Sequence, residues 1–253
     1  MNVKTLVVQH ALDLVIDGIS GKNTNAAIKK FQKDNGLVDD GIVGQKTMAA
    51  MEALVKSKEL KILDRKKFFE AIRLSIFGSL NQRHVDGMNK ILDTIGHLSI
   101  NEQAYMLATT YHETGHTMWP VVERGSRSYF DKYETGRLKR ILGNTQKGDG
   151  YRYRGRGFVQ ITGRDNYTRC GAKIGVDLAN DPDKALDLHV ASILLLRGMT
   201  EGWYRAGHKN STYISMFDAD YIKARNIING GLDRALKIAE VAMKFNIALR
   251  LGK

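Results

Sequence analysis

Residues 148–167 read GDGYRYRGRGFVQITGRDNY, a stretch in which glycines, arginines and tyrosines alternate before a run that ends in polar side chains. Arginines interleaved with tyrosines can contact phosphates and stack on bases, so the stretch could belong to a nucleic-acid-binding protein. No recognised nucleic-acid-binding module surrounds it, however. We therefore predict that nucleic acid is not a partner and that these side chains serve another chemistry.

A helix is expected to lead toward this stretch from about Asn101, which is a good N-cap residue, and to be stopped by Gly115. From Thr114 to Gly150 the chain is then polar, contains glycines and shows little periodicity. This segment is much longer than a typical connection between secondary-structure elements. It predicts a functional loop or a small irregular lobe beside a cleft.

The end of that helix, His112-Glu113-Thr114-Gly115-His116, satisfies the pattern of zinc peptidases, in which two histidines bind zinc and the glutamate activates water. Zinc binding needs an intact helix through both histidines, whereas Gly115 places His116 at or past the helix end. His189 and His208 are possible third ligands by composition, but neither lies in a ligand motif. We therefore expect no metal and no cofactor, and keep a zinc peptidase as the alternative from another class.

Glu113 has the expected surroundings of a general acid. A carboxyl group at a helix C-terminus faces the negative end of the macrodipole, and the neighbouring Tyr111 and Trp119 would limit its solvation. Both effects favour the protonated form, which is needed to protonate a glycosidic oxygen near neutral pH. A second carboxylate must then face Glu113 across the sugar. The following loop offers three: Glu123, Asp131 and Glu134.

Three separated segments occur in one order along the chain: His112-Glu113-Thr114-Gly115, the stretch at 148–167, and NIINGG at 226–231. Together they resemble the family-19 glycoside hydrolases, which comprise plant-type chitinases and related phage endolysins. The resemblance covers about residues 66–250. It implies a mainly helical, lysozyme-like catalytic domain that uses two carboxylates in an inverting mechanism.

The resemblance also implies roles for single residues. Glu113 falls on the general acid of the family, and Thr162 would help to hold the attacking water. The base is Glu123 if the chain follows the endolysin branch, which we prefer despite an apparent one-residue insertion, or Glu134 if it follows the chitinase branch. His116 replaces the usual second glycine after the acid and leaves the shape of this loop open.

Polar and aromatic side chains in the same motifs are expected to bind the sugars. Asn and Gln can satisfy both donors and acceptors of an N-acetyl sugar, and Tyr rings can pack on its apolar face. The expected substrate-binding residues are Tyr153, Gln160, Asn166, Tyr167 and Asn229. Asp233 follows at the acidic position of the family.

The N-terminal part contains an internal repeat, in which DGISGKNTNAA at 17–27 recurs as DGIVGQKTMAA at 40–50. Each copy predicts a glycine turn followed by a helix that Thr24 or Thr47 could cap. With the residues between the copies, the pattern resembles the peptidoglycan-binding domain-1 family over about residues 5–55. This implies a three-helix wall-binding module. Its motif residues are Asp17, Gly18, Phe31, Gln32, Asp40 and Gly41.

The composition limits the classes of protein to which this chain can belong. The 253 residues include 39 Lys and Arg and 27 Asp and Glu, a net charge of +12, and residues 66–253 carry most of it. A basic surface favours polyanions, among them nucleic acid, anionic lipid and an acidic wall polymer. The single cysteine, Cys170, cannot form an internal disulfide. No apolar run approaches the roughly 20 residues of a membrane helix, and the start does not read as a signal peptide.

We therefore predict a mainly α protein, with a peptidoglycan-binding module at 1–60 and a catalytic domain at 66–253. The expected function is that of an endolysin that hydrolyses β-1,4 bonds of peptidoglycan glycan strands as a monomer; a chitinase is the nearest alternative. Such a protein would stay in the host bacterial cytoplasm until a separate pore releases it to the wall. The basic helix expected at 232–251 should pack on the fold, without stable membrane insertion.

Overall fold

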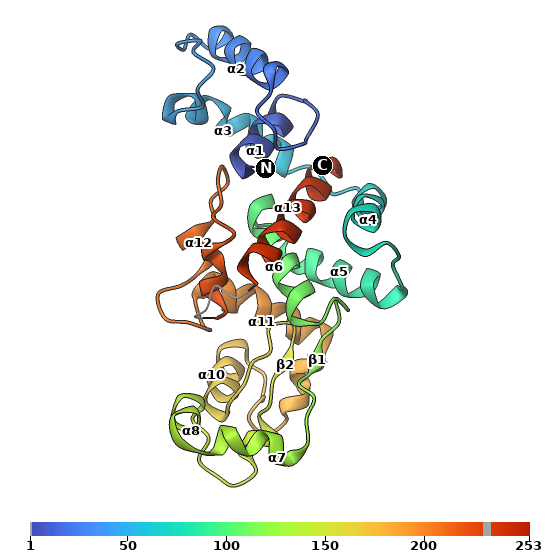
Figure 1. The fold of residues 1–253 in the computed structure, drawn as a ribbon, viewed down its shortest axis with the longest axis vertical. Coiled ribbons are helices and arrows are strands. Elements are labelled where there is room, and N and C mark those ends of the chain that lie inside the picture. The colour runs from blue at the N-terminus through green and yellow to red at the C-terminus, as the bar shows by residue number, and fades with distance from the viewer. Residues whose placement is uncertain (1, 230–233) are drawn as a thin grey trace.

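The computed structural model describes residues 2–229 and 234–253 (Figure 1). Of the motif residues, Gly230, Gly231 and Asp233 lie outside the described residues. The protein is 62% helix and 3% strand, which confirms the predicted fold class. Within the described residues, no helix combines the length and the apolar character that crossing a membrane would require.

Three helices form one end of the molecule, as expected for the N-terminal module (Figure 1). They are α1 (Val3–Ala11), α2 (Lys22–Asp34) and α3 (Gln45–Glu59). The residues that cap α2 and α3 are Gly21 and Gly44, so the expectation that Thr24 and Thr47 cap them is wrong. Both helices begin three residues earlier than predicted, which places the threonines in the first turn, where they are buried.

A buried glutamine organises the first copy of the repeat. The side-chain Nε2 of Gln9 donates to Asp17 Oδ1 at 2.7 Å and to the carbonyl of Ile19 at 3.1 Å. Its Oε1 accepts from the backbone N–H of Gly18 at 2.8 Å. Gly18 has φ +71°, a conformation that favours glycine. The Asp-Gly turn is thus closed by one side chain from α1.

The second copy repeats this arrangement 23 residues later. Gln32 donates to Asp40 Oδ1 and to the carbonyl of Ile42, both at 3.0 Å, and accepts from the N–H of Gly41 at 2.8 Å. Gln32 is only 1% exposed, so this motif residue holds the turn together inside the module. Asp40 and Gly41, like their counterparts in the first copy, build the turn, whereas Phe31 packs half-buried against the core.

The middle of the molecule is built on α6 (Ile100–Glu113), of which ten of 14 residues are buried, so it is the central helix. Ser99 caps α6, and the expected cap, Asn101, lies inside the helix instead. The C-terminal helix α13 (Ala235–Leu251) packs along α6 and buries Phe245 and Leu249, which confirms that it is a packed helix. The surrounding elements are α4 (Arg65–Ile72), the π-helix η1 (Arg73–Phe77), α5 (Gln82–Ile95), α11 (Leu188–Glu201), α12 (Asn210–Tyr213) and η4 (Lys223–Ile227).

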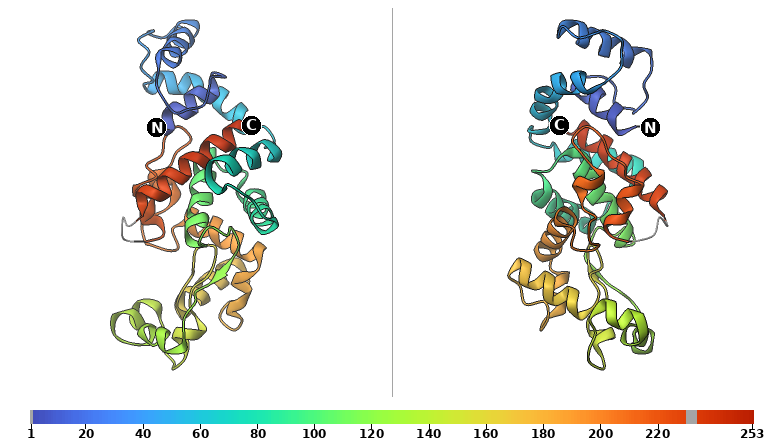
Figure 2. Two further views of the ribbon diagram at one scale, coloured as in Figure 1. Left: turned by 45° about the vertical axis from the view of Figure 1, so that its right-hand side comes forward. Right: turned by 90° about the vertical axis from the view of Figure 1, so that its left-hand side faces the viewer.

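A small lobe forms the other end (Figures 1 and 2). Its two short strands, β1 (Val121–Val122) and β2 (Arg156–Gly157), pair antiparallel. The helices of the lobe and its flank are α7 (Arg127–Phe130), η2 (Asp131–Glu134), α8 (Gly136–Leu142), α9 (Asp149–Arg152), α10 (Arg164–Ile174) and η3 (Pro182–Leu186). The segment from Thr114 to Gly150 is therefore the irregular lobe that the sequence predicts.

The N-terminal helices are joined to the middle of the molecule through α13. The guanidinium of Arg250 is buried and donates to Asn101 Oδ1 at 2.9 Å and to Asn246 Oδ1 at 2.8 Å, and it contacts His10 Nδ1 at 3.3 Å. Since His10 belongs to α1, one side chain connects three helices. A single hydrophobic core also runs from α1 and α3 into the helices around α6. The predicted boundary at residues 60–66 stays a prediction.

Removing either repeat glutamine should destabilise the protein. In Gln9→Ala or Gln32→Ala, the turn N–H, carbonyl and carboxylate groups lose a buried partner, and we expect a loss of about 1–3 kcal/mol each in the free energy of unfolding. Denaturant titration measures this loss. Lys33→Ala, an exposed substitution on α2, is the control. A Gln32→Ala variant as stable as that control would contradict the role assigned to the glutamines.

His10 should make stability depend on pH. Burial, with the neighbouring Arg250 guanidinium, lowers the pKa of His10 from 6.5 to about 3 in the folded protein. The unfolded chain therefore binds more protons between these values, and stability falls as the pH falls through this window. Between pH 7 and pH 4.5, wild type should lose about 2–3 kcal/mol more than His10→Gln in the free energy of unfolding. Urea titration at each pH checks this, and parallel curves would show that His10 is not responsible.

Candidate active site

A groove of about 220 Å³ lies where the end of α6, the segment between β2 and α10, and η4 meet. Five residues predicted from separate motifs line it together: Glu113, Gln160, Thr162, Asn166 and Asn229. The other lining residues are Leu142, Val159, Ile161, Tyr204, Arg225 and Ile228. The structure therefore brings together segments that are more than 100 residues apart in sequence.

Glu113 is the last residue of α6, and its side chain is 16% exposed. Its Oε1 lies 2.5 Å from Nη1 of Arg225, whose side chain is 7% exposed. The two side chains therefore form a close and largely buried ion pair at the groove. The two aromatic neighbours expected to shield Glu113 are engaged elsewhere: Tyr111 stacks on His116 and Trp119 lies beside Arg83.

Arg225 was not predicted as a site residue. It immediately precedes the NIINGG motif, so a basic residue beside a cleft motif was the available signal. Tyr204 was also missed; it lines the groove and donates from its hydroxyl to the carbonyl of Leu194 at 2.5 Å. The pairing of Arg225 could not be read from the sequence, because its partner Glu113 lies 112 residues away.

The chain reverses direction directly after Glu113. Thr114 donates to the carbonyl of Thr110 at 2.7 Å and accepts from the N–H of Met118 at 3.1 Å, which closes the turn. Gly115 and His116 both have positive φ angles. The predicted helix end is confirmed, and the two histidines do not lie on successive turns of one helix. In the described parts of the chain, no three His, Cys, Asp or Glu side chains gather as a metal site would require.

Gln160 and Thr162 are positioned by the short strands. Gln160 has φ +55°, and its side chain donates to the carbonyls of Val121 at 2.9 Å and Gly157 at 3.1 Å, one on each strand. Thr162 donates its hydroxyl proton to the carbonyl of Gln160 at 3.0 Å. The lone pairs of this hydroxyl are therefore left to accept a hydrogen bond, as holding a water molecule in the groove would require.

The two asparagines differ in how firmly they are held. Asn166 donates to the carbonyl of Thr162 at 2.6 Å and accepts from Arg169 at 2.8 Å, so both ends of its amide are engaged at the start of α10. Asn229 is exposed on the other side of the groove. It is the more available of the two for a hydrogen bond to a ligand.

Glu123 follows β1 and lies beside the groove. Its Oε1 accepts from the hydroxyl of Tyr133 at 2.9 Å and its Oε2 from the N–H of Gly155 at 3.1 Å. A Cβ added to Gly155 would lie 2.7 Å from Gln160 Oε1 and 3.3 Å from Glu123 Oε2, so the two side chains meet over this glycine. Burial, with the bond to Glu123, raises the pKa of Tyr133.

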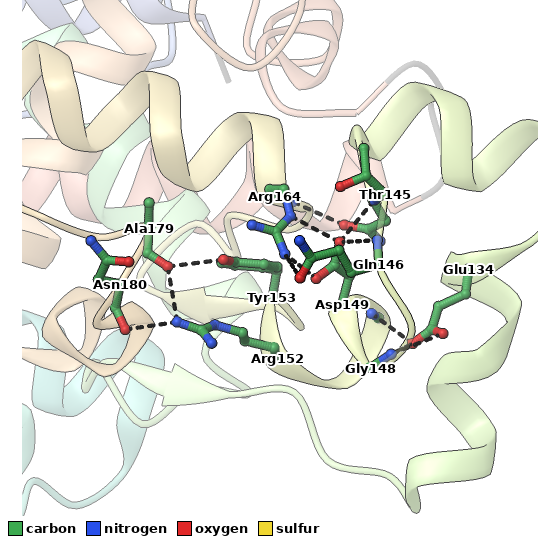
Figure 3. A network of polar contacts seen from close by, with 12 residues as sticks. Glu134, Thr145, Gln146, Gly148, Asp149, Arg152, Tyr153, Arg164, Ala179 and Asn180 are labelled. Carbon is green, nitrogen blue, oxygen red and sulfur yellow. Dashed lines mark hydrogen bonds and ion pairs between the residues drawn. The ribbon is translucent and has the colours of Figure 1, made fainter.

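Glu134, the alternative base, serves a different purpose in this structure (Figure 3). Its Oε1 accepts from the backbone N–H groups of Gly148 at 2.9 Å and Gly150 at 3.0 Å. It thus fixes the turn before α9. Neither Glu123 nor Glu134 is among the residues that line the groove, but Glu123 meets the groove residue Gln160 over Gly155. These contacts favour Glu123 as the base, although the assignment itself stays a prediction.

Tyr153 and Tyr167 require a correction. They are 1% and 0% exposed, and their rings pack against each other with centroids 5.5 Å apart. Tyr153 donates to the carbonyl of Ala179 at 2.9 Å, as Figure 3 shows, and Tyr167 donates to the carbonyl of Arg154 at 2.8 Å. Neither ring offers a face to a sugar. Both tyrosines hold the glycine-rich segment in place behind the groove.

Comparisons with known proteins match two separate parts of the chain. A family model described as a putative peptidoglycan binding domain matches residues 9–51, and one described as chitinase class I matches residues 93–203. A glycosyl hydrolase family 19 domain-containing protein of Haemophilus influenzae is 30% identical over 166 residues, which are 56% of this chain and 77% of that protein. The chain belongs to glycoside hydrolase family 19.

Two solved structures also match this family-19 chain. Chitinase C from Streptomyces griseus HUT6037 has a TM-score of 0.49 at 20% identity, over 76% of this chain and 77% of that chain. A bacterial family 19 chitinase has a TM-score of 0.44 at 21% identity, over 74% and 94%. By its family and its two domain matches, the protein is a chitinase-like glycosidase that also carries a peptidoglycan-binding domain.

The ion pair at the groove should be required for turnover. In Arg225→Gln the carboxyl group of Glu113 loses its charged partner, and we expect kcat to fall about 100-fold, a loss typical of removing a positioned charge stabiliser. The rate of new reducing ends, measured on the substrate that wild type cleaves fastest, tests this. Arg225→Lys should recover part of the rate. An unchanged kcat in a folded Arg225→Gln variant would exclude the role.

Proposed function

We propose that this protein is an endolysin, which cleaves β-1,4 glycosidic bonds in the glycan strands of bacterial peptidoglycan. The observation that carries the proposal is the union of a peptidoglycan-binding domain match at residues 9–51 with a family-19 domain in one chain. The buried contacts of Arg250 support it, because they attach the binding helices directly to the catalytic part. Binding of the first part then places the second on its substrate.

In the proposed mechanism Glu113 protonates the glycosidic oxygen while a water attacks the sugar from the opposite face. Glu123 takes a proton from that water, and the free lone pairs of the Thr162 hydroxyl hold the water in place. Because the water attacks from the face opposite the leaving group, the configuration at the sugar carbon is inverted. After proton transfer Glu113 is a carboxylate, and Arg225 stabilises this form. Asn229 supplies an exposed amide that can bind an N-acetyl group.

The same proposal includes the place of action. An enzyme that cuts the wall is harmless in the cytoplasm of the bacterium that makes it, so we propose that it acts only after release to the wall through a separate pore.

The chitinase class I match over residues 93–203 supports a second candidate, a chitinase acting on uncharged N-acetylglucosamine polymers. The zinc peptidase alternative has less support, because α6 ends before His116.

The decisive experiment is hydrolysis of purified peptidoglycan by wild type, Glu113→Gln, Glu123→Gln and Glu134→Gln. We expect Glu113→Gln and Glu123→Gln to lose at least about 100-fold in rate, since each would lack a proton-transfer group. Glu134→Gln should lower the free energy of unfolding and leave the rate of hydrolysis unchanged. Turbidity gives the rate, and mass spectrometry shows whether new reducing sugar ends form.

Glu240→Gln on the exposed face of α13 is the matched control for these variants. Full activity of a folded Glu113→Gln variant would refute the mechanism. Cleavage of chitin oligomers with no reducing ends from peptidoglycan would favour the chitinase. Activity lost to a chelator, with cut peptides as products, would favour the peptidase.

A further inference from the structure

A predominantly basic surface lies at the lobe end of the molecule. Residues 124–147 include seven Lys and Arg but only two acidic residues, Asp131 and Glu134. Glu134 is turned inward onto backbone N–H groups. Asp149, which follows this segment, is buried and paired with Arg164 at 2.5 Å. Glu134 and Asp149 are therefore used inside the lobe, and the exposed carboxylates near these seven cations are Asp131 and Asp165.

Helix α8 concentrates the positive charge. Arg137, Lys139 and Arg140 are all exposed, and none of them forms an ion pair with a described residue. Arg137 and Arg140 are three residues apart, so they share a helix face, where like charges repel. No residue of α8 is buried. These cations therefore have no carboxylate partner among the described residues, and an external anion would relieve their repulsion.

The end of α8 is fixed at the groove. Leu142, its last residue, lines the groove together with Thr162. Gly163 has φ +95°, and a Cβ there would lie 2.5 Å from the carbonyl oxygen of Leu142, so only glycine allows this approach. The N–H of Arg164 also donates to Asn144 Oδ1 at 2.9 Å. The C-terminal end of α8 therefore borders the groove, and Arg140 precedes the lining residue Leu142 by two positions.

We propose that Arg137, Lys139 and Arg140 bind the carboxylates of the peptide stems carried by a glycan strand in the groove, and so select peptidoglycan over uncharged N-acetylglucosamine polymers. This inference rests on the proposed function. Charge complementarity supports it: peptide stems carry free carboxylates at intervals along the strand, whereas chitin carries none. The cations of α8 would decide which polymer binds, and the groove residues would cleave the glycosidic bond.

Binding in a variant that cannot cleave tests the inference. In the full-length Glu113→Gln protein, Arg137, Lys139 and Arg140 are all replaced by Gln, and affinity is measured by calorimetry for soluble glycan–peptide strands. The second ligand is the same strands with their carboxylates converted to amides by carbodiimide coupling. We expect about tenfold weaker binding to the carboxylated strands, since three exposed ion pairs each contribute roughly a factor of two. Binding to the amidated strands should not change.

The matched control carries the same charge change elsewhere. Lys66, Lys237 and Lys244 are exposed, lie on α4 and α13, and are replaced by Gln in the same background. The control should bind both ligands as the parent does, and only the α8 variant should show a weaker dependence of affinity on salt. Equal losses in both variants, or a loss that persists with amidated strands, would overturn the inference.

Three further results separate this inference from a membrane-binding role and from the proposed function. If the α8 variant keeps its affinity for strands but loses binding to phosphatidylglycerol vesicles, the surface serves a membrane and the inference is wrong. If wild type releases no reducing ends from peptidoglycan but the α8 variant still loses affinity for carboxylated strands, the proposed function fails while the binding surface stands. If wild type does cut peptidoglycan and the α8 variant keeps its affinity, the inference fails while the proposed function stands.

Discussion

The ion pair between Glu113 and Arg225 is the contact on which the arrangement of the groove depends. It joins the end of the central helix, α6, to η4, and these two residues are 112 positions apart. A charged pair this close, with both side chains largely buried, holds its geometry only if both helices are fixed. The packing of α6 against α13 provides that rigidity, so the fold and the site depend on each other.

Sequence motifs identified the groove residues better than their individual roles. Glu113, Gln160 and Thr162 were predicted because short motifs fix the local chain around them, and the structure places them together. Tyr153 and Tyr167 belong to the same motif, yet they face the core, because which side of an irregular segment is buried depends on distant packing. Arg225 was missed for the same reason, since its partner lies on another helix.

The N-terminal repeat shows a second limit of predicting residue roles from sequence motifs. A residue that recurs in every copy of a repeat can bind a ligand or hold the copy together, and the sequence does not distinguish the two. Gln32 recurs as Gln9, and both are buried at the centre of identical turns. The helices, their order and the turn glycines could be predicted; the inward direction of the glutamines required the structure.

The buried connection through Arg250 has a consequence for how the two parts work together. A flexible tether would let a catalytic domain sample every bond within its length, whereas a joint closed by buried hydrogen bonds fixes the separation and the angle between anchor and groove. Once the N-terminal helices hold one strand, only bonds at one distance and orientation come within reach. If the proposed function holds, the spacing of glycan strands in peptidoglycan would then decide which glycosidic bonds are cut.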